Sequence, residues 1–322
     1  MSINFATLQS LTIPEGVVTQ IADASGRVLW SAIKLYEDRA VLTVAKQTGT
    51  TYAGSTSYEN ESFILLDIYP QKGGTVRVTY GGLTKTVKDS GTSANPNAKQ
   101  VYFGTFNGIS DSVSTPDSGT LTIEGNFTAY AAGVYQNGSK ATNKSYCGCI
   151  TNVVEFGEYL TELPLNMFRE CKSLTTISLP NSITSVSDYA FYNCTGLAIK
   201  SLPNWITHIG DHAFYNCNAI NSVQNNEFVL SSNLISIGDS AFSNCYGLKW
   251  FTIPTSVTSI GEGAFMTTGA SSVVFENTSG WYVTQTEGGD ISTGTAVDVS
   301  NASNNATMLT NTYCSGWYWY RI

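Results

Sequence analysis

The sequence predicts a mainly β protein in which two β elements precede a solenoid of stacked repeats that ends in a carboxy-terminal cap. Three observations predict this fold class: a phenylalanine-anchored repeat in the second half, short alternating apolar runs before it, and a composition with only 12% charged residues but 29 glycines and 18 tyrosines. We expect four segments: a docking element (1–32), a β-sandwich (33–142), the solenoid (143–275) and the cap (276–322).

The first segment is predicted to form a β-hairpin. Two short apolar runs flank an Asp-Ala-Ser-Gly turn at 23–26, and the second run ends in Trp30. We expect this hairpin to dock onto a partner rather than to fold alone. The segment also lacks the basic start and sustained apolar stretch of a secretory signal, so the sequence predicts no Sec export route.

Short alternating runs in the second segment predict antiparallel strands. They lie at 40–45, 75–87, 100–106 and 119–125. Inside the second run, Gly81 and Gly82 form a two-residue connection that can adopt positive φ, which is typical of a hairpin. The strands predict a compact β-sandwich with an immunoglobulin-like arrangement, although no Cys-Trp-Cys pattern indicates an antibody-type domain.

The second half of the chain repeats itself around one phenylalanine per unit. These phenylalanines are 23, 23, 28 and 23 residues apart, namely Phe168, Phe191, Phe214, Phe242 and Phe265. Units of this length cannot bury their apolar edges alone, so they stack. We expect about five units, with a five-residue insertion within 222–233.

Each unit contains three apolar rows. The first is a strand whose inward residues in the first unit are Leu174, Ile177 and Leu179, and which Pro180 ends. The second row is Ile183 with Val186 and their equivalents, and the Ala-Phe pair supplies the third. An acidic residue before that pair is predicted to start a short helical turn, and a cysteine after it is predicted to pack as a small apolar group.

From about residue 150 to 322, these positions recur together in a pattern that resembles the BspA-like leucine-rich repeats of bacterial surface proteins. The resemblance implies a solenoid that serves recognition. Three departures affect its regularity: Lys200 replaces an inward apolar residue, Asn226 stands at the strand proline of the third unit, and Thr268 replaces the cysteine of the fifth. The amino-terminal part resembles tail-associated structural proteins of phages and prophages.

The sequence offers little that predicts catalysis or cofactor binding. Its two histidines, His208 and His212, fall at variable repeat positions that we expect to be exposed, and Cys147 with Cys149 lack the further ligands that zinc requires. We therefore expect no catalytic residues, no metal and no cofactor. A net charge of -8 and the absence of a long apolar run argue against nucleic-acid partners and membrane insertion.

The outward residues of the predicted strands are the candidate ligand-binding residues. Trp250 is the foremost of them, because an exposed aromatic ring can stack on a sugar or fill a pocket in a partner. The full candidate set is Thr176, Ser178, Ile199, Ser201, Trp205, Lys249, Trp250 and Thr252. We expect the terminal Trp317, Tyr318, Trp319 and Tyr320 to pack in the cap instead.

Three functional hypotheses follow. The first is a phage or prophage virion surface protein, in a tail, baseplate or capsid fibre, that contacts other virion proteins through its amino-terminal region. Its repeats would bind a glycan or protein of the host bacterial surface. The second is a bacterial BspA-like cell-surface adhesin, and the third is a glycan depolymerase. A homo-oligomer is compatible with each.

Overall fold

The structure is a computed structural model, and it describes residues 20–22, 28–31, 38–48, 62–71, 74–89, 99–106, 109–125, 127–132, 134–136, 144–146, 148–157, 160–220 and 227–322. The chain divides into two compact units, Met1–Glu37 and Asp38–Ile322. Within the described ranges, no helix has the length and apolar character needed to cross a bilayer.

The first unit contains a two-stranded antiparallel sheet. Strand β1 (Gln20–Ala22) pairs with β2 (Val28–Ser31). The two strands of the predicted hairpin are thereby confirmed, whereas the predicted turn at 23–26 lies outside the described residues.

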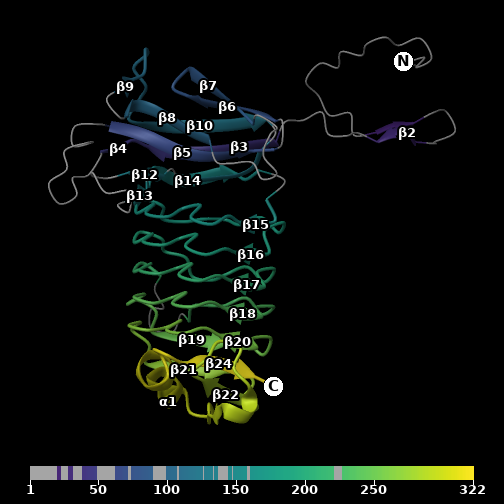
Figure 1. The fold of residues 1–322 in the computed structure, drawn as a ribbon, viewed down its shortest axis with the longest axis vertical. Helices are drawn as coiled ribbons and strands as arrows, with labels where there is room; N and C mark the ends of the chain where they lie inside the picture. The colour runs from purple at the N-terminus through teal and green to yellow at the C-terminus, as the bar shows by residue number, and fades with distance from the viewer. Residues whose placement is uncertain are drawn as a thin grey trace. The chain divides into compact units, whose positions relative to one another are not determined.

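The second unit begins with two antiparallel sheets (Figure 1). The first has the strand order β14 (Ile150–Glu155), β3 (Asp38–Ala45), β10 (Ser118–Gly125), β6 (Thr75–Tyr80) and β7 (Leu83–Lys88). The second has the order β11 (Phe127–Ala132), β5 (Ser62–Pro70), β8 (Lys99–Phe106) and β9 (Ile109–Ser110), with β4 (Gln47–Thr48) also on β5. A short pair, β12 (Val134–Gln136) with β13 (Lys144–Tyr146), accompanies them.

All four alternating runs form strands, as predicted, in β3, β6 with β7, β8 and β10. Gly81 and Gly82 connect β6 to β7 at φ +57° and +80°, which confirms the hairpin. Strand β5 was not predicted. Its residues 63–68 are all buried, so it lacks the alternation that marks a strand with one exposed face.

The two sheets pack against each other and form a sandwich. The Tyr80 ring of β6 meets the Phe103 ring of β8 edge-on, with 5.6 Å between ring centroids. Cys149, next to β14, donates from Sγ to the carbonyl of Leu65 on β5 at 3.6 Å. The immunoglobulin-like connectivity stays a prediction.

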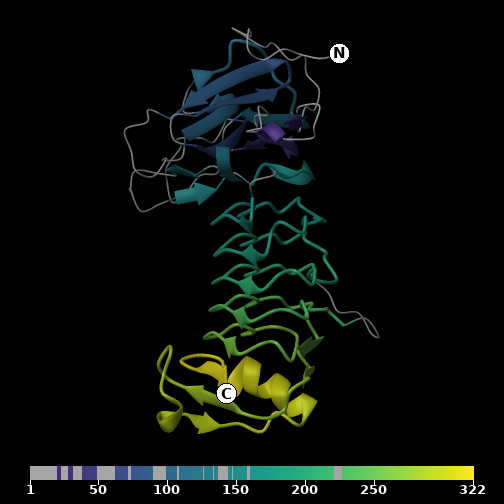
Figure 2. The ribbon, with the colours of Figure 1, turned by 90° about the vertical axis from the view of Figure 1, so that its right-hand side faces the viewer.

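After β14 the chain winds into the predicted stack of repeats (Figures 1 and 2). One edge of the stack is a row of two-residue parallel strands, which we call the first strand row. It comprises β15 (Glu162–Leu163), β16 (Ser185–Val186), β17 (His208–Ile209), β18 (Ser236–Ile237) and β20 (Ser259–Ile260). The second residue of each strand is buried, which confirms the second apolar row.

The row that was predicted to form strands in every repeat is less regular. This second strand row comprises residues 175–179, 198–202 and 228–230, then β19 (Trp250–Ile253) and β21 (Ser272–Phe275). Only β19 and β21 form a ladder. The strand prediction is wrong for the first two repeats, which one backbone hydrogen bond joins in this row, from Ala198 N to Thr175 O at 2.8 Å. The second repeat then meets the third in a single isolated bridge, between Ser201 and Val229.

The turn after this row begins at Pro180, Pro203 and Pro254, whose carbonyls each accept from the residue three positions later. In the third repeat the carbonyl of Ser231 does this for Leu234 N at 3.0 Å. The assignment of Asn226 to the proline position is therefore wrong, because the insertion precedes Ser231. Residues 221–226 lie outside the described residues.

The cap closes the carboxy-terminal end of the stack, as predicted (Figure 2). Helix α1 (Ala302–Thr307) starts at Asn301, whose side chain accepts from Asn304 N, and continues into a π-helical turn (Met308–Thr312). Strand β24 (Tyr318–Arg321) pairs with β20 and with β22 (Trp281–Thr284), which pairs with β23 (Thr295–Ala296). A short 3-10 turn spans Ile291–Thr293.

Candidate functional site

A continuous stack of phenylalanine rings forms the core of the solenoid. Neighbouring rings are nearly parallel, and their centroids are 5.2, 5.0, 5.1 and 5.5 Å apart along the series Phe168, Phe191, Phe214, Phe242 and Phe265. All five rings are buried. The repeats are therefore held at one spacing, and any side chain that recurs on the surface recurs at that spacing too.

The repeat cysteines form a second internal ladder. Sγ of Cys194, Cys217 and Cys245 donates to the carbonyls of Phe168, Phe191 and Phe214 at 2.9, 3.0 and 3.1 Å. Burial raises the pKa of all of these thiols, that of Cys245 to about 12. These cysteines are structural, as predicted, since a nucleophilic cysteine requires a lowered pKa.

Cys149 belongs to the same ladder. It is buried, and it lies near the thiol of Cys171, the next cysteine along the stack, whose pKa burial and the neighbouring cysteines raise. A Cβ on Gly148 would lie 2.0 Å from the carbonyl oxygen of Glu170, so only glycine fits there. Gly148 and Cys149 therefore stack on the first repeat, which the 22-residue step from Cys149 to Cys171 could have revealed, whereas Cys147 lies outside the described residues.

The acidic residue of each repeat bonds to the next repeat. Oδ1 of Asp188 accepts from Asp211 N, Oδ1 of Asp211 from Asp239 N, and Oδ1 of Asp239 from Glu262 N, each at 2.8 Å. Glu262 accepts from Gly316 N of the cap at 2.8 Å. The predicted helical turn is wrong: the next residue is left-handed, for instance Tyr189 at φ 56°. The carboxylates therefore link repeats instead of capping helices.

The glycine that precedes three of these acids follows from the same contact. A Cβ on Gly210, Gly238 or Gly261 would lie 2.3–2.5 Å from Oδ1 of the aspartate in the preceding repeat. Ser187 takes this place in the second turn, where the preceding repeat has Leu165 at the acidic position. The aspartate of one repeat therefore requires a glycine at this position in the next repeat.

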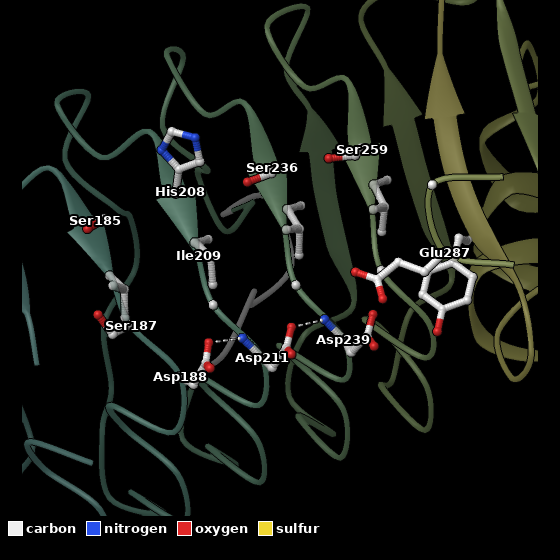
Figure 3. Close-up of a pocket in the computed structure, with 18 of the residues that line it drawn as sticks. Ser185, Ser187, Asp188, His208, Ile209, Asp211, Ser236, Asp239, Ser259 and Glu287 are labelled. Atoms are coloured by element: carbon white, nitrogen blue, oxygen red, sulfur yellow. Dashed lines mark hydrogen bonds between the residues drawn. The ribbon is translucent and has the colours of Figure 1, made fainter. Parts of the chain in front are cut away.

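This row of carboxylates lines a groove of about 870 Å³ that runs along the first strand row (Figure 3). Ser185, His208, Ser236 and Ser259 line it from successive strands, beside Asp188, Asp211 and Asp239. Glu287, Tyr318 and Tyr320 of the cap line its carboxy-terminal end. The groove thus presents a carboxylate at three successive repeats and a serine at three of four strands, and it ends at two phenols.

The groove is electrostatically negative. Burial and the nearby carboxylates of Asp211, Glu287 and Glu262 raise the pKa of Asp239. Desolvation, with the carboxylates of Asp239, Glu262 and Glu287, also raises the pKa of Tyr318. Among the described residues that line the groove there is no lysine or arginine. It therefore favours a ligand that carries positive charge.

Tyr318 and Tyr320 were expected to pack inside the cap, but the alternation of β24 turns both towards the groove, so this prediction is wrong for Tyr318. Tyr320 also lies against Tyr282 of the cap, with 5.8 Å between ring centroids, so the prediction is correct in part for Tyr320. It is correct for Trp319, which is buried against Phe275, Trp281 and Tyr313. Successive residues of a strand point to opposite faces, so the Tyr-Trp-Tyr sequence at 318–320 could have predicted that the tyrosines face the groove while Trp319 faces the core.

Four of the predicted ligand-binding residues lie together. Ser178, Ile199, Ser201 and Trp205 line a second, smaller pocket over the first two repeats. The two serines and Trp205 are exposed as expected, whereas Ile199 is half-buried and packs against the core. Its outward placement is therefore wrong.

The other predicted residues lie apart from that pocket. Trp250 and Thr252 are half-buried on β19, and Lys249 is exposed beside it. Thr252 Oγ1 donates to Glu227 Oε2 at 3.3 Å, and the carbonyl of Trp250 accepts from Phe228 N at 3.1 Å. Thr176 is exposed in the first repeat. The predicted face is thus divided between two places.

The two histidines differ. His208 is exposed in the groove, as predicted, and its Nδ1 is 2.8 Å from Thr207 Oγ1. His212 was expected to be exposed but is half-buried, with its ring stacked on Tyr189 at 4.9 Å. Within the part of the chain that the structure describes, no three His, Cys, Asp or Glu side chains are grouped to hold a metal ion.

Comparisons with known proteins agree with this architecture. Residues 136–227 and 221–282 match the family described as BspA type Leucine rich repeat region, in six copies. No curated protein matches the chain.

Solved structures that match include a T. pallidum leucine-rich-repeat protein (33% identity over 35% of this chain and 51% of that one, TM-score 0.32). A leucine-rich cell surface protein from Faecalibacterium prausnitzii matches with 27% identity over 38% of this chain and 40% of that one, at a TM-score of 0.25. A leucine-rich-repeat protein from Bacteroides ovatus matches with 15% identity over 42% of this chain and 56% of that one, at a TM-score of 0.21. The chain spans about half the length of these proteins. The family match thus covers residues 136–282, which include the stacked repeats.

Proposed function

We propose that this chain is a recognition protein of a bacterial cell surface, an adhesin that binds an extended, positively charged ligand along the groove of its repeat region. The observation that carries the proposal is the groove itself, which presents carboxylates and hydroxyls from successive repeats. The match to BspA-type repeats supports the surface role, because repeats of this type occur in bacterial surface proteins.

The geometry of the groove favours a ligand that is long rather than compact. Neighbouring parallel strands are about 4.8 Å apart, so β16, β17, β18 and β20 offer polar groups at that interval. An extended polypeptide repeats its side chains on one face about every 6.6 Å, and it can meet several of these groups at once. We therefore propose a lysine- or arginine-bearing segment of a protein as the ligand class.

Binding without catalysis is part of the proposal. Asp188, Asp211 and Asp239 each accept a backbone hydrogen bond from the next repeat, which holds their carboxylates in place. Such fixed charges suit electrostatic recognition. The alternative of a glycan depolymerase is tested by incubating the purified protein with surface glycans, where released fragments would contradict a purely binding role.

A binding measurement tests the ligand class. Fluorescein-labelled octapeptides of lysine, glutamate or serine are titrated with the purified chain at two salt concentrations. We expect the lysine peptide alone to bind, and more weakly at high salt, because exposed charges are screened. Equal affinity for the serine peptide, or affinity that does not respond to salt, would refute the charged ligand.

The location is tested on intact cells. We expect a membrane-impermeant biotin reagent to label the chain on cells in which no phage has been induced. The phage or prophage role stays the alternative. The family match covers residues 136–282 and does not include the amino-terminal part, on which the resemblance to phage proteins depends. Mass spectrometry of purified virions that detects this chain would favour the phage role over the adhesin.

A further inference from the structure

A second pocket, of about 220 Å³, opens over the first two repeats on the second strand row. Its floor includes the buried rings of Phe191 and Phe214, two members of the phenylalanine stack. Ile177, Ile199 and Leu202 form its sides. The pocket is thus an apolar opening that reaches the core, and it shares no lining residue with the groove.

The pocket exists because one repeat lacks an apolar side chain at one position of the second strand row, position 200. Parallel pairing places Lys200, Phe228, Phe251 and Val273 at equivalent positions of the second strand row, since Ser201 pairs with Val229, Phe228 with Phe251, and Phe251 with Val273. Phe228, Phe251 and Val273 are buried, whereas Lys200 is exposed. The lysine therefore leaves open the volume that its equivalents fill.

The next two repeats show what this volume accepts. The Phe228 ring meets the Phe242 ring edge-on at 5.9 Å, and the Phe251 ring stacks on the Phe265 ring at 4.5 Å. Each is an aromatic ring that covers a member of the phenylalanine stack. The equivalent cover over Phe214 would come from position 200, which has no ring.

We propose that this pocket binds a monocyclic aromatic group of an outside ligand, which covers Phe214 as Phe228 and Phe251 cover their neighbours. An apolar cavity of about 150 Å³ is known to bind benzene, so the volume here suffices for one substituted ring. Aromatic pairs at these separations are favourable beyond the area that they bury. The pocket takes a ring that the chain itself does not supply.

The rim indicates which ring fits best. Ser178 and Ser201 are exposed at the opening, and the indole of Trp205, 39% exposed, forms part of the wall. A hydroxyl on the ring can bond to a serine at the rim while the apolar part is buried. A phenol is therefore the expected ligand class.

Titration of the full chain with 4-methylphenol tests the site. Calorimetry measures the binding, and the difference in fluorescence between the wild type and Trp205→Phe reports the emission of Trp205. We expect saturable binding to the full chain and a change in Trp205 emission. The saturated analogue 4-methylcyclohexanol is expected to bind at least several-fold more weakly, because it has no aromatic face. Equal binding of the two compounds, or none of 4-methylphenol, would overturn the proposal.

Lys200→Phe supplies the missing ring from within the chain. It is expected to abolish 4-methylphenol binding and to raise the midpoint of thermal unfolding, whereas Lys200→Gln leaves both unchanged. Undiminished binding to Lys200→Phe would place the ligand elsewhere. Should Lys200→Phe not fold, Trp205→Ala is the second variant, and we expect several-fold weaker binding with an unchanged circular dichroism spectrum; unchanged affinity would contradict the site.

Discussion

The two strand rows of the solenoid differ in how strictly they repeat. In the first row and its acidic ladder, Asp211, Asp239 and Glu262 each donate a backbone hydrogen bond at the same 2.8 Å to the preceding repeat. In the second row, equivalent positions carry Lys200 and Phe251, and a ladder forms only between β19 and β21. The regular row sets the stacking, which leaves the second row free to vary.

This division follows from the architecture of a solenoid. Each repeat contacts only its neighbours, so a residue that bonds to the next repeat must recur in order to continue the stack. A residue that serves only its own repeat can change without affecting the others. Periodic polar groups therefore suit an extended ligand, whereas a local change such as Lys200 makes a local pocket.

The largest expected effect is on the phenylalanine stack. Phe214→Ala removes a fully buried ring that contacts Phe191 and Phe242, so it should destabilise the solenoid by about 3–5 kcal/mol. Ile199→Ala in the variable row should cost less than about 2 kcal/mol, since Ile199 is only half-buried. Urea unfolding measures both, and equal losses would contradict the contrast between the regular phenylalanine stack and the variable second strand row.

A smaller effect is expected where a methyl group is added to the regular row. In Gly238→Ala the new Cβ would lie 2.5 Å from Asp211 Oδ1 and 2.7 Å from Asp211 N, which should cost about 1–3 kcal/mol. Ser187→Ala, at the same place in an earlier repeat, should be nearly neutral. If Gly238→Ala were equally neutral in thermal unfolding, the repeats would not be held as closely as described.

The smallest effect is a pH dependence. Burial raises the pKa of Asp239 above its ordinary 3.8, so the folded state binds this proton more tightly than the unfolded state does. Its contribution to stability therefore grows as the pH falls from neutral through the raised pKa. Asp239→Asn should remove that growth, as measured by urea midpoints across this range.

The pKa of Asp290, an acid of the cap, is shifted in the opposite direction. Hydrogen bonds from the backbone and side chain of Ser292 lower the pKa of Asp290, so its contribution to stability is lost on acidification. Asp290→Asn should therefore change the pH profile in the direction opposite to Asp239→Asn. Shifts of the same sign would contradict the difference between groove and cap.

The sequence predicted the periodic parts of this molecule well and the aperiodic parts poorly. The spacing of Phe168 and its equivalents predicted the stack, since one residue per turn must fill one place. The strand row that forms most pairs, with Val186 and Ile209, was predicted only as a buried row, because two-residue strands leave no alternation to detect. The groove was missed because a turn aspartate was assumed to cap its own turn.

The second pocket arises from a difference between equivalent positions of neighbouring repeats. Lys200 was identified as a departure from the pattern, but the sequence alone does not show that Ile199 turns inward beside it. Nor does it show that Ser201 and Trp205 line one pocket with Phe214, because Phe214 belongs to the next repeat. Contacts that recur with the period could be predicted, whereas contacts created by an exception to the period could not.

The most direct test of the account compares two charge-matched variants in binding the lysine octapeptide. Asp188→Asn with Asp211→Asn removes two groove charges but keeps the oxygens that accept backbone hydrogen bonds, whereas Asp117→Asn with Asp298→Asn removes two charges outside the groove. The groove variant should lose at least about fivefold in affinity, because each charge contributes about 0.5–1 kcal/mol. The second variant should match the wild type, and an equal loss in both would contradict recognition in the groove.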